Sequence, residues 1–366
     1  MRDISATRVV IKIGTNTICG EDGKVDSVYL DSIARQVIEL DGQGVQSVIV
    51  TSGAIGSGSS ELGLDGMQMD MAHKQACAAV GQAALMLTYR EVFARYGKSV
   101  GQLLLTYTAF SDRKVYLNLR KSMDALFSLG VIPIINENDV ISTDEIGNTF
   151  GDNDKLSALV ASKVDADLLI MLTDVDGLYD RNPETDKDAR FIDTVDEITK
   201  DIELMGGSGT SGRSKGGMKS KINAARIAMG SGCNAIIANG KENDVILRVV
   251  RGEKIGTLFS ANALYNNRER WILYASPRGK ISVDAGAEDA LKNEGSLLPC
   301  GITAVEGRFK EGDVVRIGTF AKGVVNFPSG EIMQLKAACE KEKKQGNGKV
   351  HSDSVVIDHY NMVFHE

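Results

Sequence analysis

The sequence is poor in proline, with 5 prolines in 366 residues, although it contains 39 glycines. Disordered and collagen-like chains are rich in both residues, so this imbalance excludes those classes and indicates glycines that serve tight backbone geometry. No apolar run approaches the roughly 18 residues that a membrane-spanning helix needs. Residues 1–14 lack the apolar segment of a signal peptide, because Arg8 and Lys12 interrupt it. We therefore expect a cytoplasmic protein.

Close cysteine pairs and an excess of positive charge are also missing. The five cysteines are widely spaced and odd in number, which argues against a zinc site or a disulfide framework and favours a reducing compartment. With 42 basic and 49 acidic residues the net charge is −7. A protein that coats nucleic acid or binds anionic membranes carries a surplus of positive charge, so the net charge argues against both classes. The length suggests two domains and is enough to bury a large core.

Up to about residue 240, short apolar runs alternate with helix-like segments. Strands that are apolar throughout predict a parallel sheet covered by helices on both faces, which is an α/β fold. The expected strands lie at 9–13, 47–50, 100–105, 131–135, 167–172 and 234–238, and the expected helices at 30–40, 71–96, 112–129, 154–164 and 218–229. After Pro277 the segments become short and are punctuated by glycine, which predicts a small β-rich domain. Its charged segment 340–349 is expected to be a solvated hairpin tip.

Two basic, glycine-containing segments suit a bound phosphate. Lys12 and Gly14 end the first expected strand, at the edge where α/β sheets bind ligands. The stretch 206–221, GGSGTSGRSKGGMKSK, brings glycine amides and lysines to a helix start, and these together form an anion cradle. An ordinary strand-end lysine and a flexible linker are the alternatives. Four basic residues at a helix start favour a nucleotide-phosphate site over a linker.

Polar residues also follow three other expected strands. Residues 50–58, VTSGAIGSG, allow a carboxylate or phosphate to approach the backbone, but they lack the spacing of a P-loop and are equally compatible with a plain turn. The clusters NEND (136–139) and GDND (151–154) flank one loop, and helix capping accounts for only part of them. They suit an ammonium group or a cation. Thr173 and Asp174 end another strand, where a simple β-turn is the alternative.

In this order, the segments resemble the amino acid kinase family, and within it the enzymes that phosphorylate free glutamate. The matching segments are VVIKIGT (9–15), VTSGAIGSG (50–58), INENDVIST (135–143), FGDNDKLSA (150–158), LTDVDGLYD (172–180) and KGGMKSK (215–221). Residues after Pro277, including GSLLPCGI (295–302), resemble the PUA domain that follows the kinase domain in those enzymes. The resemblance implies an amino acid kinase-like open, mainly parallel sheet sandwiched by helices at 1–262, a linker at 263–279 and a β-rich PUA domain at 280–366.

The resemblance implies an ATP-dependent phosphotransferase with a carboxyl acceptor. It would transfer the γ-phosphoryl group of ATP to the γ-carboxylate of L-glutamate, forming L-glutamyl 5-phosphate in the first step of proline biosynthesis. A γ-carboxylate with a pKa of about 4.3 is already ionised at neutral pH, so the reaction needs positioning and charge neutralisation rather than a general base. The resemblance assigns the positive charge to Lys12 and Lys221, organised by Asp154. Mg²⁺ would accompany ATP, and no protein ligand can be assigned to it.

The same resemblance implies the binding residues. The expected glutamate-binding residues are Ser52, Asp139, Asn153 and Asn136. The expected ATP-binding residues are Lys12, Thr173, Asp174, Lys215, Gly216, Gly217, Met218, Lys219, Ser220 and Lys221. The sequence departs from the family twice. The nucleotide loop reads Ser-Lys-Gly-Gly at 214–217, where Gly-Thr-Gly-Gly is common, and residues 140–150 contain no lysine or arginine.

Partners implied by the resemblance are L-glutamate, L-proline as a feedback inhibitor, a transient complex with glutamyl phosphate reductase, and further copies of the chain in a homo-oligomer. Three alternatives remain. The first is another kinase of the family, acting on acetylglutamate, uridylate or aspartate. The second is an RNA-binding protein that uses its PUA domain, although residues 277–366 hold 12 basic and 13 acidic residues and lack a basic surplus. The third is a regulatory protein with an inactive kinase fold, which the presence of Lys12, Asp154 and Lys221 disfavours.

Overall fold

The chain forms two compact units. The computed structural model describes residues 1–20, 23–106, 108–142, 153–183, 185–207, 217–261, 265–344 and 354–364. The first unit consists of residues 1–106 and 117–264, and the second of residues 107–116 and 265–366. Within the described ranges, no helix is long and apolar enough to cross a membrane.

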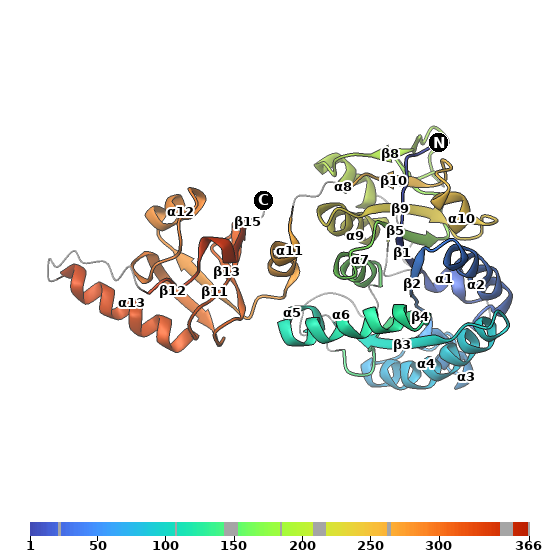
Figure 1. Ribbon diagram of the computed structural model, residues 1–366, viewed down its shortest axis with the longest axis horizontal. Coiled ribbons are helices and arrows are strands. Elements are labelled where there is room, and N and C mark those ends of the chain that lie inside the picture. The colour runs from blue at the N-terminus through green and yellow to red at the C-terminus, as the bar shows by residue number, and fades with distance from the viewer. Residues whose placement is uncertain are drawn as a thin grey trace. The chain divides into compact units, whose positions relative to one another are not determined.

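The first unit is built on a sheet with the strand order β3-β4-β2-β1-β5-β9-β10-β8 (Figure 1). The strands from β3 to β9 in this order are parallel to their neighbours: β3 (Val100–Leu105), β4 (Ile132–Glu137), β2 (Gln46–Val50), β1 (Arg8–Ile13), β5 (Leu168–Thr173) and β9 (Asn234–Asn239). At one edge, β10 (Thr257–Phe259) runs antiparallel to β9, and β8 (Thr194–Val195) runs parallel to β10. A small hairpin pairs β6 (Leu178–Tyr179) with β7 (Phe191–Ile192). The predicted mainly parallel α/β sheet is confirmed.

Helices cover this sheet, and the longer ones match the predicted segments. They are α2 (Ser27–Gly42), α4 (Met71–Ala94), α6 (Arg113–Ser128), α7 (Asn153–Lys163) and α9 (Met218–Gly230), joined by the shorter α1 (Thr15–Ile18), α3 (Ala54–Glu61), α8 (Lys200–Gly207) and α10 (Val245–Val250). Alternate residues of β1 face opposite sides of the sheet. Val9 and Ile11 join a buried cluster with residues of α2, α4 and α10. Lys12 therefore faces the other side, where α7 contacts β1.

The second unit is a small β-rich domain, as predicted. Its sheet has the order β12-β11-β13-β14-β15. The strands are β11 (Gly279–Val283), β12 (Ile302–Gly307), β13 (Val314–Ile317), β14 (Ala321–Val324) and β15 (Met362–Phe364), and the helices are α5 (Thr108–Ser111), α11 (Asn267–Tyr274), α12 (Ala285–Lys292) and α13 (Ser329–Lys344), with short 3₁₀ turns at Pro299–Gly301 and His359–Asn361. Helix α11 lies within the expected linker and begins with a capping box between Asn266 and Glu269. The domain limits at 262 and 280 stay a prediction.

The predicted hairpin tip at 340–349 is wrong in its first half. Residues 340–344 continue helix α13, and residues 345–349 lie outside the described residues. Lysine and glutamate are good helix formers, and Lys336 and Glu340 form an ion pair one turn apart at 2.6 Å. The turn residues of the segment, at 346–348, come after the charged residues 340–344, which suit a helix.

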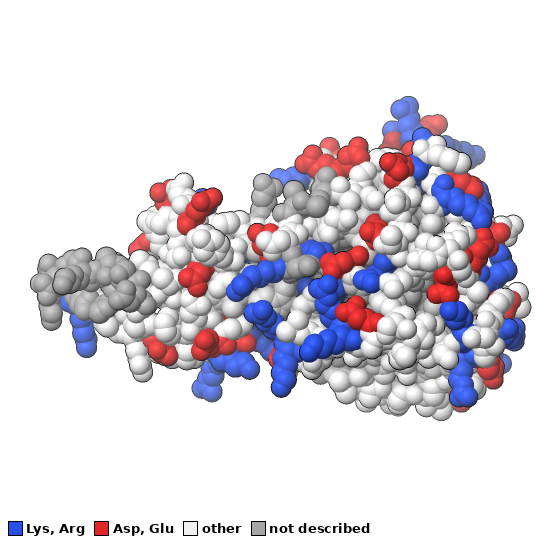
Figure 2. All heavy atoms as spheres, in the orientation of Figure 1, with Lys and Arg blue, Asp and Glu red and all other residues white. Residues whose placement is uncertain are grey.

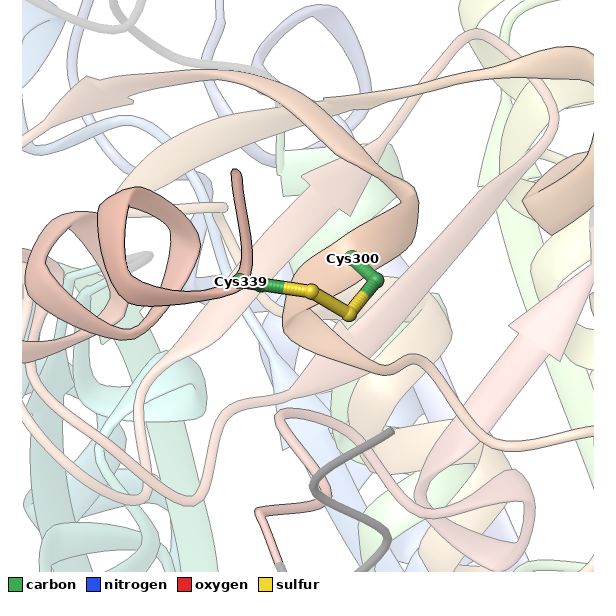
Figure 3. The surroundings of a disulfide bond; sticks show 2 residues. All are labelled: Cys300 and Cys339. Atoms are coloured by element: carbon green, nitrogen blue, oxygen red, sulfur yellow. A yellow bond between two sulfur atoms is a disulfide. The ribbon is translucent and has the colours of Figure 1, made fainter. Parts of the chain in front are cut away.

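The expectation of a chain without disulfides is also wrong. Cys300, in the 3₁₀ turn Pro299–Gly301, is bonded to Cys339 of α13, with 5.5 Å between the two Cα atoms (Figure 3). This spacing is ordinary for a disulfide. The cysteines are 39 positions apart, so their distance in sequence carried no sign of the pairing. The spacing of the cysteines therefore does not indicate a reducing compartment.

Because the disulfide closes a long loop, Cys300→Ser is expected to destabilise the second unit by about 2–4 kcal/mol, mainly through the unfolded chain. Thermal unfolding, followed with and without a thiol reductant, measures this effect. The reductant should lower the melting temperature of the wild type to that of Cys300→Ser and leave the variant unchanged. A wild type that melts at the same temperature in both buffers would contradict the prediction.

Candidate active site

Two lysines and one aspartate meet at the carboxyl edge of the sheet. Lys12, near the end of β1, places Nζ 2.6 Å from Oδ1 of Asp154, and Lys221 of α9 places Nζ 3.1 Å from Oδ2 of the same carboxylate. All three are buried, with exposed fractions of 6%, 2% and 7% for Lys12, Asp154 and Lys221. A single carboxylate therefore fixes the positions of two ammonium groups from separate elements. The structure brings together the three residues that the sequence predicted to be catalytic.

Among these three side chains, positive charge exceeds negative charge. Burial acts to raise the pKa of Asp154, but the charges of Lys12 and Lys221 outweigh it and hold that pKa below its usual value. The carboxylate is thus ionised at neutral pH, and two positive charges face one negative charge. The surplus positive charge suits a phosphoryl group that carries negative charge during transfer.

Local sequence explains how the three side chains are positioned. Asp154 lies in the first turn of α7, and Lys221 lies in the first turns of α9, which begins after Gly217. Helix starts present unpaired backbone N–H groups and the positive end of the helix dipole, which favour a nearby anion. At the end of β1, a Cβ added to Gly14 would lie 3.5 Å from both Nζ of Lys12 and the carbonyl oxygen of Leu172. Gly14 keeps the space beside Lys12 open.

A second cluster, of amide and hydroxyl groups, lies beside the first. Asn153 Nδ2 donates to the carbonyl oxygen of Thr51 at 2.9 Å, to Ser52 Oγ at 2.9 Å and to Asn136 Oδ1 at 3.1 Å. Asn136 in turn donates to Gln82 Oε1 of α4 at 2.7 Å. Because Asn153 directly precedes Asp154, this cluster is connected to the lysine site through the chain itself. Three of the four predicted glutamate-binding residues therefore form one hydrogen-bonded group.

The fourth, Asp139, is buried near another acid. Burial raises the pKa of Asp139 to about 7, and the charge of Glu137 adds to the rise. Its Oδ1 atom is buried without a hydrogen-bond partner in the described part of the chain. A buried carboxylate in this state is strongly stabilised by a cationic ligand. Asn138, between the two acids, instead builds a turn, since its carbonyl oxygen accepts from Ile141 and Ser142.

The predicted nucleotide residues are only partly described. Thr173 Oγ1 donates to Asp174 Oδ1 at 3.0 Å at the end of β5, and Asn16 donates to the other oxygen at 3.2 Å. Asp174 is exposed. Gly217, Met218, Lys219 and Ser220 form the start of α9, with Lys219 exposed. Lys215 and Gly216 lie outside the described residues.

Sequence reasoning missed two groups that the structure places at the site. Gln82 follows the buried stripe of α4, which also contains Ala78, Leu85 and Tyr89. A glutamine on such an apolar stripe is a signal that the sequence offered and that was not used. Asn16, which donates to Asp174, gave no comparable signal because it is an exposed polar residue of the short helix α1.

The parallel α/β sheet, the two lysines paired on Asp154 and the amide cluster are the features expected of an amino acid kinase. Comparison with known families agrees. Residues 7–239 match the model of the amino acid kinase family, and residues 279–345 match the PUA domain. The chain belongs to the amino acid kinase family.

Curated relatives with the name glutamate 5-kinase match nearly the whole chain. The relative from Methanosarcina mazei is 49% identical and the match covers 92% of this chain and 90% of the relative. The relative from Methanococcoides burtonii is 48% identical over 96% and 95%, and that from Citrifermentans bemidjiense is 44% identical over 96% and 97%. The two lysines, the aspartate and the amide cluster therefore lie in a chain that resembles these enzymes from end to end.

Proposed function

We propose that this protein is an ATP-dependent kinase of L-glutamate that forms L-glutamyl 5-phosphate, the first step of proline biosynthesis. The observation that carries the proposal is the pairing of Lys12 and Lys221 on Asp154, next to a buried cluster of amides and acids. The first group suits a phosphoryl group, and the second suits the zwitterionic end of an amino acid. The near-complete match to curated glutamate 5-kinases supports the same substrate.

In this proposal the phosphoryl group is transferred without a general base. The γ-carboxylate of glutamate is ionised at neutral pH, so one of its oxygens attacks the γ-phosphorus of ATP directly. The bond from that phosphorus to the β,γ-bridging oxygen breaks, and ADP leaves. Lys12 and Lys221 would neutralise the charge on the phosphoryl oxygens during transfer. Asp154 would hold both ammonium groups in place, since it is paired with each of them before substrates bind. Thr173, Asp174 and residues 215–221 would bind ATP.

The amino-acid end of glutamate would lie in the amide and acid cluster. Asp139 presents a buried acceptor, and Asn153 Oδ1 is a second buried acceptor without a hydrogen-bond partner in the described chain. Both suit the ammonium group of free glutamate, which acetylglutamate lacks. Ser52 and Asn136 would complete the glutamate site, because they share the hydrogen bonds of Asn153.

We also infer that Mg²⁺ binds with ATP rather than in a site made by the protein alone. In the described part of the chain, no group of three histidine, cysteine or acidic side chains could hold a metal ion. Mg²⁺ commonly binds through substrate phosphates and keeps several waters. The ion would reduce the negative charge of the ATP phosphates.

The assignment can be tested with a panel of acceptors. With ATP, Mg²⁺ and hydroxylamine, glutamate should give a hydroxamate, because hydroxylamine traps the acyl phosphate. Acetylglutamate, aspartate and UMP should give little turnover, which ADP release would measure for each. If one of these three turns over and glutamate does not, the proposed substrate is wrong.

The raised pKa of Asp139 predicts how glutamate binding depends on pH. Below about pH 7 the carboxyl group is mostly protonated and cannot pair with the substrate's ammonium group. The KM for glutamate should therefore rise about tenfold between pH 8 and pH 6, as the ionised fraction of Asp139 falls. Steady-state kinetics at saturating MgATP measures this. Asp139→Asn should have a high KM that hardly changes with pH, and a wild-type KM that is flat over the same range would contradict the prediction.

The remaining partners belong to the same proposal. L-proline would inhibit by feedback at or near the glutamate site, and L-glutamyl 5-phosphate would pass to its reductase in a transient complex. The chain itself would form a homo-oligomer. The second unit shows interspersed acidic and basic side chains on the face seen in Figure 2, which supports a small-molecule enzyme over an RNA-binding protein. A cytoplasmic location stays a prediction.

A further inference from the structure

The hydrogen bonds of the amide cluster determine which way each amide group points. The backbone N–H of Glu137 donates to Asn136 at 2.9 Å, so the accepting atom of Asn136 is its oxygen. The Asn136 nitrogen then faces Gln82, which must accept with its own oxygen. Asn153 donates to the backbone carbonyl of Thr51, so its nitrogen is fixed as well. Two backbone groups thus set the orientation of three side-chain amides.

With these orientations, the cluster has one donor and two acceptors left over. Gln82 Nε2 is buried without a hydrogen-bond partner in the described chain, as are Asn153 Oδ1 and Asp139 Oδ1. Gln82 as a whole is only 9% exposed. A buried polar group without a partner is costly, and native proteins seldom keep one unless a ligand satisfies it. Gln82 and Asn153 are both hydrogen-bonded to Asn136, so a free donor and a free acceptor lie on either side of one residue. Such a pair is the complement of an α-amino acid, which carries a carboxylate and an ammonium group on one carbon.

The position of Gln82 in the fold places it near the expected site of the substrate's α-carbon, which carries the α-carboxylate and the ammonium group. Its partner Asn136 lies on β4, and β2 separates β4 from β1, which carries Lys12 (Figure 1). Neighbouring strands are about 4.8 Å apart, so the ends of β4 and β1 are roughly 10 Å apart. An extended glutamate can place its γ-carboxylate toward Lys12 and its α-carbon toward Asn136 and Gln82.

The position of Gln82 is also fixed by close packing of helix α4 against α3. A Cβ added to Gly81 would lie 1.9 Å from the carbonyl oxygen of Ala54, and one added to Gly58 would lie 1.9 Å from the carbonyl oxygen of Cys77. The two glycines therefore allow the backbones of α3 and α4 to touch. Since α3 follows directly after Ser52, this contact fixes the distance between Gln82 and the expected glutamate-binding loop.

We propose that Gln82 Nε2 donates a hydrogen bond to the α-carboxylate of the amino acid substrate and so determines specificity for that group. The inference rests on the proposed glutamate kinase function and adds a binding residue to the same site. An amide suits this position, because it can donate to the substrate while its oxygen accepts from Asn136. The substrate's ammonium group would bind the two unpartnered acceptors.

The test combines a variant with substrate analogues. Glutarate keeps both carboxylates of glutamate and lacks the ammonium group, whereas 4-aminobutyrate lacks the α-carboxylate. Gln82→Met should raise the KM for glutamate and the inhibition constant of glutarate by about 10–100-fold, because a hydrogen bond to a charged group is lost. The inhibition constant of 4-aminobutyrate and the KM for ATP should stay within about twofold of wild type.

Two control variants separate the loss of the Gln82 donor from a general loss of stability. Gln36→Met removes a glutamine of α2 that is even more deeply buried than Gln82 and that donates to Ser32 and accepts from Ile246. It should alter stability but not the constants for either analogue. Gln82→Glu, assayed above pH 8, keeps an oxygen for Asn136 but has no donor, so it should weaken glutamate and glutarate binding even if Gln82→Met folds poorly.

An equal loss for glutamate, glutarate and 4-aminobutyrate would overturn the proposal, since Gln82 would then act only by supporting Asn136. Unchanged constants for all three in Gln82→Met would overturn it as well. A failure of the proposed function itself looks different: the wild type would then give no glutamate-dependent hydroxamate at all.

Discussion

Replacing Lys221 with alanine is expected to lower kcat for glutamate phosphorylation by about 10²–10³-fold, the usual effect of removing one group that stabilises transition-state charge. Lys221 is one of the two cations held by Asp154, and it lies 3.1 Å from that carboxylate. Its loss leaves Lys12 and Asp154 as a nearly neutral pair, so the surplus positive charge of the site disappears. The KM for glutamate should change much less, because the amide cluster is not altered.

The control for this variant is Arg226→Ala on the same helix. Arg226 is exposed and pairs with Glu203 of α8, so its removal should leave kcat near the wild-type value. Steady-state kinetics measures both variants, and circular dichroism shows whether each is folded. If a folded Lys221→Ala protein retains more than a tenth of the wild-type kcat, Lys221 does not stabilise the transferring phosphoryl group.

Asp154→Asn is expected to lower the free energy of unfolding by about 3–5 kcal/mol, because it removes a carboxylate that the structure pairs with two buried lysines. The asparagine keeps the size of the side chain but not its charge. Lys12 and Lys221 would then repel each other in a buried site. Turnover should fall together with stability, since neither ammonium group would be held in position.

The matched control is Asp165→Asn, just after the end of the same helix. Asp165 is more exposed, pairs with Arg120 and has a positive φ of 50°, a conformation that asparagine also adopts readily. Its ion pair is near the surface and contributes about 0–1 kcal/mol. Urea unfolding of the two variants gives the comparison. If the two variants lose the same small amount of stability, the pairing of Asp154 with the two buried lysines does not stabilise the fold, and the prediction is wrong.

The sequence predicted the sheet and the central site well because both follow from strong local signals. A parallel sheet that is buried on both faces requires strands such as β1 and β5, in which nearly every residue is apolar. Lys12 stands out in such a strand, because a buried lysine needs a partner. The helix starts that carry Asp154 and Lys221 were likewise marked by glycine and capping residues.

Features that depend on contacts between distant parts of the chain could not be predicted from the sequence. The hydrogen bond between Gln82 and Asn136 joins residues 54 positions apart, and no period in the sequence indicates it. The disulfide between Cys300 and Cys339 was missed for the same reason. The end of α13 was misread because a solvated run of lysine and glutamate is compatible with both a loop and an exposed helix.

The central claim, that the γ-carboxylate of glutamate is itself the nucleophile, is tested most directly with an oxygen label. Glutamate labelled with ¹⁸O at both γ oxygens is incubated with the enzyme, MgATP and hydroxylamine, and the released phosphate is analysed by mass spectrometry. Hydroxylamine attacks the acyl carbon, so the phosphate leaves with the oxygen that bridged carbon and phosphorus. The account predicts one ¹⁸O in each phosphate that accompanies a hydroxamate. Phosphate without label would mean that water or another group accepts the phosphoryl group, and it would contradict the account.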